Sequence, residues 1–174
     1  MEYQLSHEES LSKFKWEKWP ALFFLLDRID YPDNIAHLIR ITNSLWWTKI
    51  IIWGSREINM KKIESVAKSY NTRMIDIIKT DNILDYILNN KNIEQFVCVE
   101  ITSNSRLYYN VKYDFSKSIW IIVWSEKHWI SNDILSSINR SVHIPMLWSN
   151  SSMNVSHAWI VVAYDIVRQY LSNI

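Results

Sequence analysis

Short runs of consecutive apolar residues alternate along the chain with segments that carry apolar residues at helical spacing. The apolar runs cover residues 21–26, 48–52, 74–78, 95–101, 119–123 and 142–144. Each run has the length of a strand, and strands that are apolar throughout are expected where helices cover both faces of a parallel sheet. The pattern therefore predicts six strands.

The segments between these runs predict helices at 32–45, 59–70, 81–88, 132–138 and 154–171. Pro32 suits the first turn of the first helix, and Asp81 is the predicted N-cap of the third. Residues 103–117 are polar and are expected to form a loop. Strands that alternate with helices indicate an α/β fold with a mostly parallel sheet.

The length and charge of the chain are typical of one domain with a buried core. The chain has 174 residues and a formal net charge of +1, so we expect no polyanion-binding field over the whole molecule, although a local basic surface remains compatible with it. Residues 1–19 are charged and predict an N-terminal arm or short helix, which leaves 20–174 as the domain. The single cysteine, Cys98, excludes an internal disulfide framework and a cysteine-cluster metal site.

No stretch of the sequence reaches the length of a transmembrane helix, and the first residues lack the pattern of a signal peptide. We therefore expect a cytoplasmic protein with no membrane partner.

The glycine and tryptophan contents are both unusual. The chain has ten tryptophans and one glycine, whereas an average composition would include roughly 12 glycines. Trp46 and Trp47 follow a helical segment, where a glycine C-cap is common. We hypothesise that most of the tryptophans are encoded by UGA codons that the organism reads as glycine. The heavy use of Ile, Asn and Lys fits an AT-rich genome, in which such reassignments occur.

Polar segments follow several of the predicted strands, and the carboxyl ends of parallel strands are where ligands bind. The segments after Asp27, Ile101, Val123 and Ile144 should therefore lie near one another. The last of them leads through a Ser/Asn-rich loop to Ser152-Met153-Asn154, which is an N-cap signal for the closing helix. Such a joint offers backbone N–H and C=O groups to a ligand.

Three motifs occupy these segments. The first is Asn34-Ile35-Ala36-His37-Leu38-Ile39-Arg40, and the second is Trp124-Ser125-Glu126-Lys127-His128-Trp129-Ile130-Ser131. The third is Ile144-Pro145-Met146-Leu147-Trp148, followed by Ser152-Met153-Asn154-Val155-Ser156-His157-Ala158. In this order and at these spacings, the motifs resemble those of the SpoU-like (TrmH-type) RNA ribose 2′-O-methyltransferases of the SPOUT class.

The family patterns are Asn-x-Gly-x-x-x-Arg, then Gly-Ser/Thr-Glu-x-x-Gly-Ile/Leu-Ser, then Ile-Pro-Met-x-Gly with Ser-Leu-Asn-Val-Ser-x-Ala. The resemblance covers about residues 21–172. This chain has Trp124, Trp129 and Trp148 where the family has glycine, and Ala36 also replaces a glycine. Backbone approaches a ligand closely at such glycines, so an indole at 124 or 148 would occupy the cleft.

The resemblance implies a fold, a cofactor and an assembly. The expected fold is a mostly parallel six-stranded sheet with helices on both faces and a C-terminal trefoil knot, in which the segment after Ile144 threads a loop. The expected assembly is a homodimer that meets through the opening and closing helices. The expected cofactor is S-adenosyl-L-methionine, held near Ile101, Trp124, Ile144, Leu147, Ser152 and Met153.

The resemblance also implies catalytic roles. Arg40 would be the essential residue, Asn34 would orient it, and Glu126 and Asn154 would anchor Arg40 or the ribose. Because arginine does not readily lose its proton, we expect Arg40 to clamp phosphate and stabilise the developing alkoxide. No metal is required, since the sulfonium leaving group is already activated. The histidines lack metal-ligand spacing, and we expect surface or core positions for His37, His128, His143 and His157.

These inferences predict an RNA ribose 2′-O-methyltransferase that acts on tRNA, because a small domain suits a compact RNA recognised by shape. A local basic surface would bind the phosphates, with Lys13, Lys15, Lys18, Arg28, Arg40, Arg56 and Lys127 as candidates. Two alternatives remain open. One is a catalytically inactive RNA-binding homologue, which the tryptophans in the motifs would favour. The other is a knotted methyltransferase that modifies an RNA base.

Overall fold

The computed structural model describes residues 3–6, 8–9, 12, 21–28, 31–42, 44–45, 49–53, 61, 76–80, 82–124, 129–138, 140–147 and 149–173. The predicted helix at 59–70 lies outside these residues except for Lys61, and most of the arm at 1–19 does as well. The elements in chain order are β1 (Leu22–Asp27), α2 (Pro32–Thr42), β2 (Lys49–Trp53), β3 (Asp76–Thr80), α4 (Ile83–Asn90), β4 (Gln95–Val99), β5 (Arg106–Leu107), the 3₁₀ turn η2 (Tyr108–Asn110), β6 (Ile119–Trp124), α5 (Asn132–Ile138), β7 (Ser141–His143) and α6 (Val155–Leu171).

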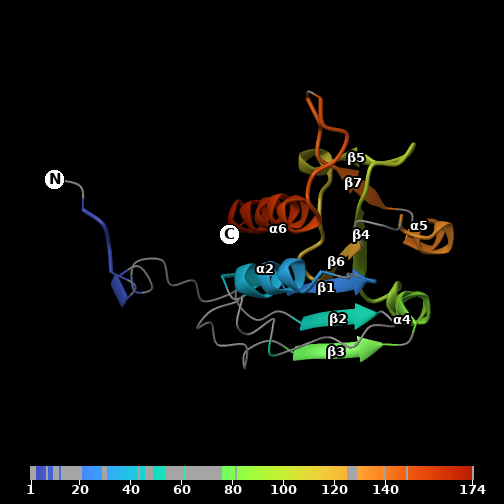
Figure 1. Ribbon diagram of the computed structural model, residues 1–174, viewed down its shortest axis with the longest axis horizontal. Coiled ribbons are helices and arrows are strands. Elements are labelled where there is room, and N and C mark those ends of the chain that lie inside the picture. Colours follow the sequence, from blue (N-terminus) through green and yellow to red (C-terminus); the bar gives the residue numbers. More distant parts are fainter. Residues whose placement is uncertain are drawn as a thin grey trace.

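The strands form one parallel sheet in the order β3-β2-β1-β6-β4-β7-β5 (Figure 1). The sheet has seven strands, so the prediction of six is wrong. The seventh is β5, which pairs with β7 at the sheet edge and lies inside the segment 103–117 that was expected to be a loop. Two residues are too short to produce a recognisable apolar pattern, and only the pairing with β7 makes them a strand.

The third predicted helix forms, but its N-cap is not the predicted residue. The helix α4 begins at Ile83, and its N-cap is Asn82, whose side-chain oxygen accepts a hydrogen bond from the Asp85 backbone N–H at 3.2 Å. The prediction of Asp81 as the cap is therefore wrong. Asn and Asp are equally good N-caps, so adjacent candidates cannot be separated by residue type alone.

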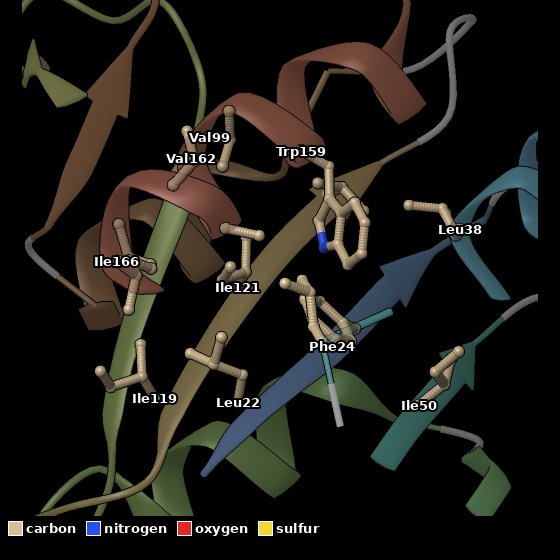
Figure 2. Packing of buried hydrophobic residues seen from close by; sticks show 14 of the residues in the cluster. Leu22, Phe24, Leu38, Ile50, Val99, Ile119, Ile121, Trp159, Val162 and Ile166 are labelled. Atoms are coloured by element: carbon tan, nitrogen blue, oxygen red, sulfur yellow. The ribbon is translucent and has the colours of Figure 1, made fainter. Parts of the chain in front are cut away.

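Helices cover both faces of the sheet, as predicted. Alternate strand residues such as Leu22, Phe24 and Ile121 face α2 and α6, while Leu25 and Cys98 face α4 and α5. Figure 1 shows α2 beside α6, with α4 and α5 on the other side. In the larger core, Phe24 meets the edge of the Trp159 ring at a centroid distance of 4.4 Å (Figure 2). Two-sided burial explains why the strands are apolar throughout.

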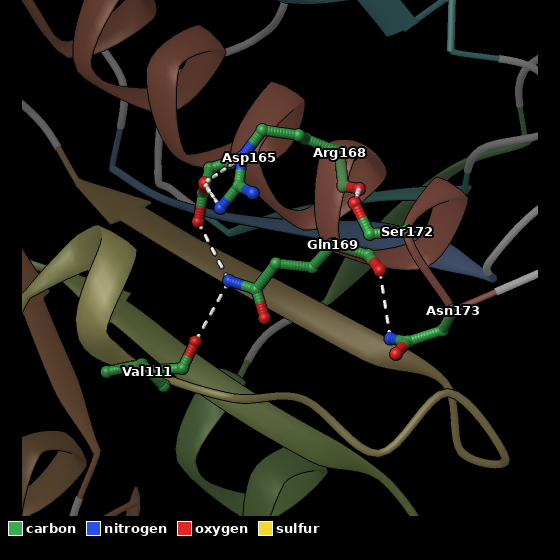
Figure 3. A network of polar contacts seen from close by, with 6 residues as sticks. All are labelled: Val111, Asp165, Arg168, Gln169, Ser172 and Asn173. Carbon is green, nitrogen blue, oxygen red and sulfur yellow. Dashed lines mark hydrogen bonds and ion pairs between the residues drawn. The ribbon is translucent and has the colours of Figure 1, made fainter.

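The helix α6 is also held by buried polar contacts (Figure 3). The Gln169 side-chain amide donates hydrogen bonds to the Val111 carbonyl and to the Asp165 carboxylate, each at 2.9 Å. Arg168 donates to the other Asp165 oxygen at 2.7 Å. These bonds fix α6 against the segment that follows η2, and thereby fix the position of its N-terminus. Among the helices that the structure describes, none is both long and apolar enough to cross a membrane.

Candidate functional site

A cleft of about 350 Å³ opens at the carboxyl ends of β4, β6 and β7, where α6 begins. These three strands are neighbours in the sheet, so the segments that follow Ile101, Val123 and Ile144 converge there as expected. The described residues directly after Asp27, which are Arg28 and Tyr31, are not part of the cleft lining. There the fully buried Asp27 carboxylate accepts a hydrogen bond from Arg28 Nε at 2.8 Å.

Most of the residues predicted to hold a cofactor lie around this cleft. Five of the six line it, namely Ile101, Trp124, Ile144, Ser152 and Met153. The sixth, Leu147, is 88% exposed and is not part of the lining. The walls are mainly apolar and carry few polar groups, which is the usual character of a small-molecule site.

Two of the predicted catalytic residues are brought together by α2 and α6. Asn154 is the N-cap of α6, and its side-chain oxygen accepts a hydrogen bond from the Ser156 N–H at 2.9 Å. Its amide nitrogen donates to the Asn34 side-chain oxygen at 3.3 Å. Asn154 also lines the cleft, so this bond joins the first and third motifs at the cleft wall.

Of the other two predicted catalytic residues, one is described away from the cleft lining and one is not described. Arg40 is exposed in the last turn of α2 and is not among the lining residues. It follows Asn34 by six residues, which corresponds to about 9 Å along a helix axis. Glu126 lies outside the described residues.

The structure adds two polar residues that sequence reasoning missed, Glu100 and His143, which both line the cleft. Burial raises the pKa of the Glu100 carboxyl, and a hydrogen bond from the Ile101 N–H to Glu100 Oε1 at 2.7 Å partly opposes this shift. A signal for Glu100 was present in the sequence, because it is the only acidic residue inside the apolar run 95–101. We had expected a surface or core position for His143.

Two of the three motif tryptophans lie at the cleft. Trp124 is half-buried and lines the cleft, and Trp129 lines it while remaining 77% exposed. Trp148 lies outside the described residues. Both described tryptophans are therefore part of the cleft wall, where the sequence predicted an indole for position 124.

A metal centre has no support in the described part of the chain. No group of three or more His, Cys, Asp or Glu side chains that could hold a metal ion occurs within the described residues. The described lining residues offer apolar walls, backbone groups and a few hydrogen-bonding side chains.

Comparison with known proteins gives a consistent result. The model of the SpoU rRNA Methylase family matches residues 21–164. The 23S rRNA (guanosine-2'-O-)-methyltransferase RlmB of Acinetobacter baylyi is 22% identical over 165 residues, which cover 95% of this chain and 66% of that protein. The chain thus spans just under two thirds of the length of this curated relative.

Two solved structures have the same fold. The TrmH/SpoU tRNA modifying enzyme of A. aeolicus matches with a TM-score of 0.73 and 20% identity, covering 95% of this chain and 85% of that chain. The SpoU methyltransferase AviRb of Streptomyces viridochromogenes, in complex with the cofactor AdoMet, matches with a TM-score of 0.72 and 21% identity, covering 93% and 65%.

Proposed function

Because this chain belongs to the SpoU rRNA Methylase family, we propose that it transfers a methyl group from S-adenosylmethionine to a ribose 2′-oxygen of RNA. The observation that carries the proposal is the cleft, which gathers five of the six residues expected around the cofactor. The solved AviRb complex with AdoMet supports the choice of cofactor.

The lining residues fit such a cofactor. Ile101, Ile144 and Met153 offer apolar surface for a flat base and a thioether chain, while Ser152 and Asn154 offer polar groups at the start of α6. When bound, S-adenosylmethionine supplies a methyl group on a sulfonium that needs no further activation. The chain's own task is to position the ribose hydroxyl and to exclude water.

Asn34 and Asn154 would hold the wall on which the ribose rests, since their side chains are already joined by a hydrogen bond. Arg40 would clamp an RNA phosphate and stabilise the developing alkoxide. Its exposed position on α2 leaves it accessible to RNA that lies over this surface.

We also propose a homodimer whose interface includes α2 and α6. The helices α2 and α6 lie side by side (Figure 1). Tyr164 on α6 is 48% exposed, and aromatic residues are enriched in interfaces. The C-terminal trefoil knot belongs to the same proposal, and the fold likeness to the two SpoU structures supports it.

The tryptophans in the cleft wall favour one competing function, an inactive RNA-binding homologue. Calorimetry with S-adenosylmethionine separates the two on a triple variant, Trp124→Gly, Trp129→Gly and Trp148→Gly, compared with the unchanged chain. Binding by the triple variant is expected for a methyltransferase whose native residues are glycines. Absence of binding by both proteins would favour the inactive homologue.

The product identifies the reaction. The triple variant is incubated with host tRNA or ribosomal RNA and methyl-labelled S-adenosylmethionine, and the RNA is digested with alkali. Because 2′-O-methylation blocks cleavage of the adjacent phosphodiester, label is expected in alkali-resistant dinucleotides from tRNA. Label in mononucleotides would indicate base methylation, and label only in ribosomal RNA would replace tRNA as the proposed substrate.

A further inference from the structure

Glu100 and His143 lie side by side at the cleft, on neighbouring strands. The register of β4 and β7 pairs Cys98 with Ser141 and Val99 with Val142, and the Glu100 N–H donates to the Val142 carbonyl at 2.8 Å. The next residues along the two strands are therefore Glu100 and His143. Both line the cleft.

Glu100 is only 8% exposed and has one oxygen without a partner. Its Oε1 accepts the hydrogen bond from the Ile101 N–H at 2.7 Å, whereas Oε2 is buried and has no hydrogen-bond partner. An unpaired buried carboxyl oxygen is unfavourable, and a ligand hydroxyl would relieve the cost after a rotation of the Glu100 side chain exposes this oxygen to the cleft.

The hydrogen bonds of Ser105 favour one of the two tautomers of His143. The Ser105 hydroxyl donates to the Thr102 carbonyl at 2.8 Å and accepts from the Thr102 N–H at 3.0 Å. With its proton directed at the Thr102 carbonyl, Ser105 acts as the acceptor at the 3.0 Å contact with His143 Nδ1, which corresponds to the tautomer with the proton on Nδ1. In neutral His143, Nε2 is then a hydrogen-bond acceptor.

We infer that Glu100 and His143 are a pair of acceptors for the two ribose hydroxyls of the cofactor's nucleoside, with Ser105 as the positioning residue for His143. The inference rests on the proposed function. Neighbouring strands lie about 4.8 Å apart, so two hydroxyls on adjacent ribose carbons can each donate to one of these side chains. Most of the other described lining residues are apolar, and among the described residues at the strand ends these two side chains supply the acceptors.

Calorimetry with S-adenosylhomocysteine tests the pair, with the full-length triple glycine variant of the binding experiment above as the parent protein. In Glu100→Gln, an amide nitrogen replaces the unpaired oxygen while the bond to Ile101 is kept. His143→Asn keeps a donor toward Ser105 but removes the Nε2 acceptor, whereas His143→Gln restores an acceptor near the Nε2 position. Asp133→Asn, on the exposed face of α5, is the matched control.

We expect Glu100→Gln and His143→Asn each to weaken binding about tenfold, as for the loss of one hydrogen bond to a charged or buried group. His143→Gln and Asp133→Asn should bind as the parent does. The 2′-deoxy and 3′-deoxy analogues of S-adenosylhomocysteine should each bind the parent about tenfold less tightly. In each variant, the analogue that lacks the hydroxyl bound by the substituted side chain should show no further loss of affinity.

A second measurement needs no cofactor. The ¹⁵N chemical shifts of His143 in the free protein should report the tautomer with the proton on Nδ1, and Ser105→Ala should shift the equilibrium toward Nε2–H. A proton on Nε2 in the parent protein would overturn the inference.

The binding data separate two kinds of failure. If the parent binds S-adenosylhomocysteine and the variants bind it equally well, the acceptor pair is wrong while the proposed function stands. The same conclusion follows if the substitutions weaken the binding of both deoxy analogues as much as they weaken the binding of S-adenosylhomocysteine itself. If the parent chain does not bind S-adenosylhomocysteine at all, the proposed function fails, and this inference fails with it.

Discussion

At the scale of single residues, Glu100 destabilises the folded protein and also lies at the cleft. Its carboxyl group is buried at the end of β4 with one oxygen unpaired, and burial raises its pKa. Residues that weaken a fold in this way are expected at functional sites, where a ligand supplies the missing partner.

Glu100 should therefore make stability depend on pH. Because its pKa is raised in the folded protein, the folded state still binds the proton at a pH where the unfolded chain has released it, so stability falls as the pH rises through this interval. The melting temperature of Glu100→Gln relative to wild type should decrease as the pH is lowered and level off below about pH 4. Thermal melts across a pH series measure this, and a difference independent of pH would contradict it.

The tryptophans raise a separate question at the same scale. Trp159 is fully buried, and its indole nitrogen has no hydrogen-bond partner among apolar neighbours (Figure 2). A buried indole usually finds a partner. This position, and the exposed Trp129 at the cleft wall, are what the glycine hypothesis predicts for residues that are not native.

Mass spectrometry of the protein purified from its own organism decides this question. We expect peptides with glycine at most tryptophan positions, 124, 129 and 148 included, because glycine suits backbone that approaches a ligand. The intact mass should then lie below the 20.9 kDa of the printed sequence. A native mass equal to that of the printed sequence would end the hypothesis.

At the scale of elements, α6 joins the core to the cleft. Its apolar residues pack on the sheet, its buried Asp165 and Gln169 hold the segment after η2, and its N-cap Asn154 lies at the cleft. The position of the cleft wall thus depends on contacts made near the other end of the same helix (Figure 3).

Removing the Gln169 side chain should loosen this attachment. Gln169→Ala leaves the buried Val111 carbonyl and one Asp165 oxygen unpaired, which should lower the free energy of unfolding by about 1–3 kcal/mol. Ser172→Ala removes an exposed hydroxyl bond to the Arg168 carbonyl on the same helix and should change it by less than about 0.5 kcal/mol. Urea unfolding compares them, and equal effects would show that the buried bonds contribute little.

At the scale of the whole molecule, the strand order sets both the cleft and the distribution of stability. β6 and β4 lie inside the sheet and carry the cleft at their ends, while β3 and β5 are the two edge strands. Interior strands are paired on both sides and covered by helices on both faces, which favours a rigid base for the site.

Hydrogen exchange should follow this order. We expect the backbone amides of β1, β6 and β4 to exchange most slowly and those of β3 and β5 to exchange fastest among the strands, because edge strands lack a partner on one side. Exchange followed by mass spectrometry gives the ranking. Protection of β3 or β5 equal to that of β6 would contradict the sheet order or indicate a further partner at that edge.

Local patterns in the sequence predicted much of this architecture. The apolar runs located the longer strands to within a few residues, and α5 was predicted with the bounds that it has. The order of the motifs placed Ile101, Trp124, Ile144, Ser152 and Met153 at one edge of the sheet. These features follow from periodicity and from the rule that parallel strands end at a common edge, both of which depend on short stretches of chain.

Other features were decided only by contacts between distant residues. The strand β5 exists through its pairing with β7, Ser105 favours one tautomer of His143, and Asn34 meets Asn154 only after α2 and α6 pack. Glu100 has an unpaired oxygen because of where β4 ends in the assembled sheet. Sequence alone therefore determined which elements form and which edge carries the cleft. Tertiary packing decided which polar atoms remain available there, because hydrogen-bond partners far apart in the chain meet only in the folded protein.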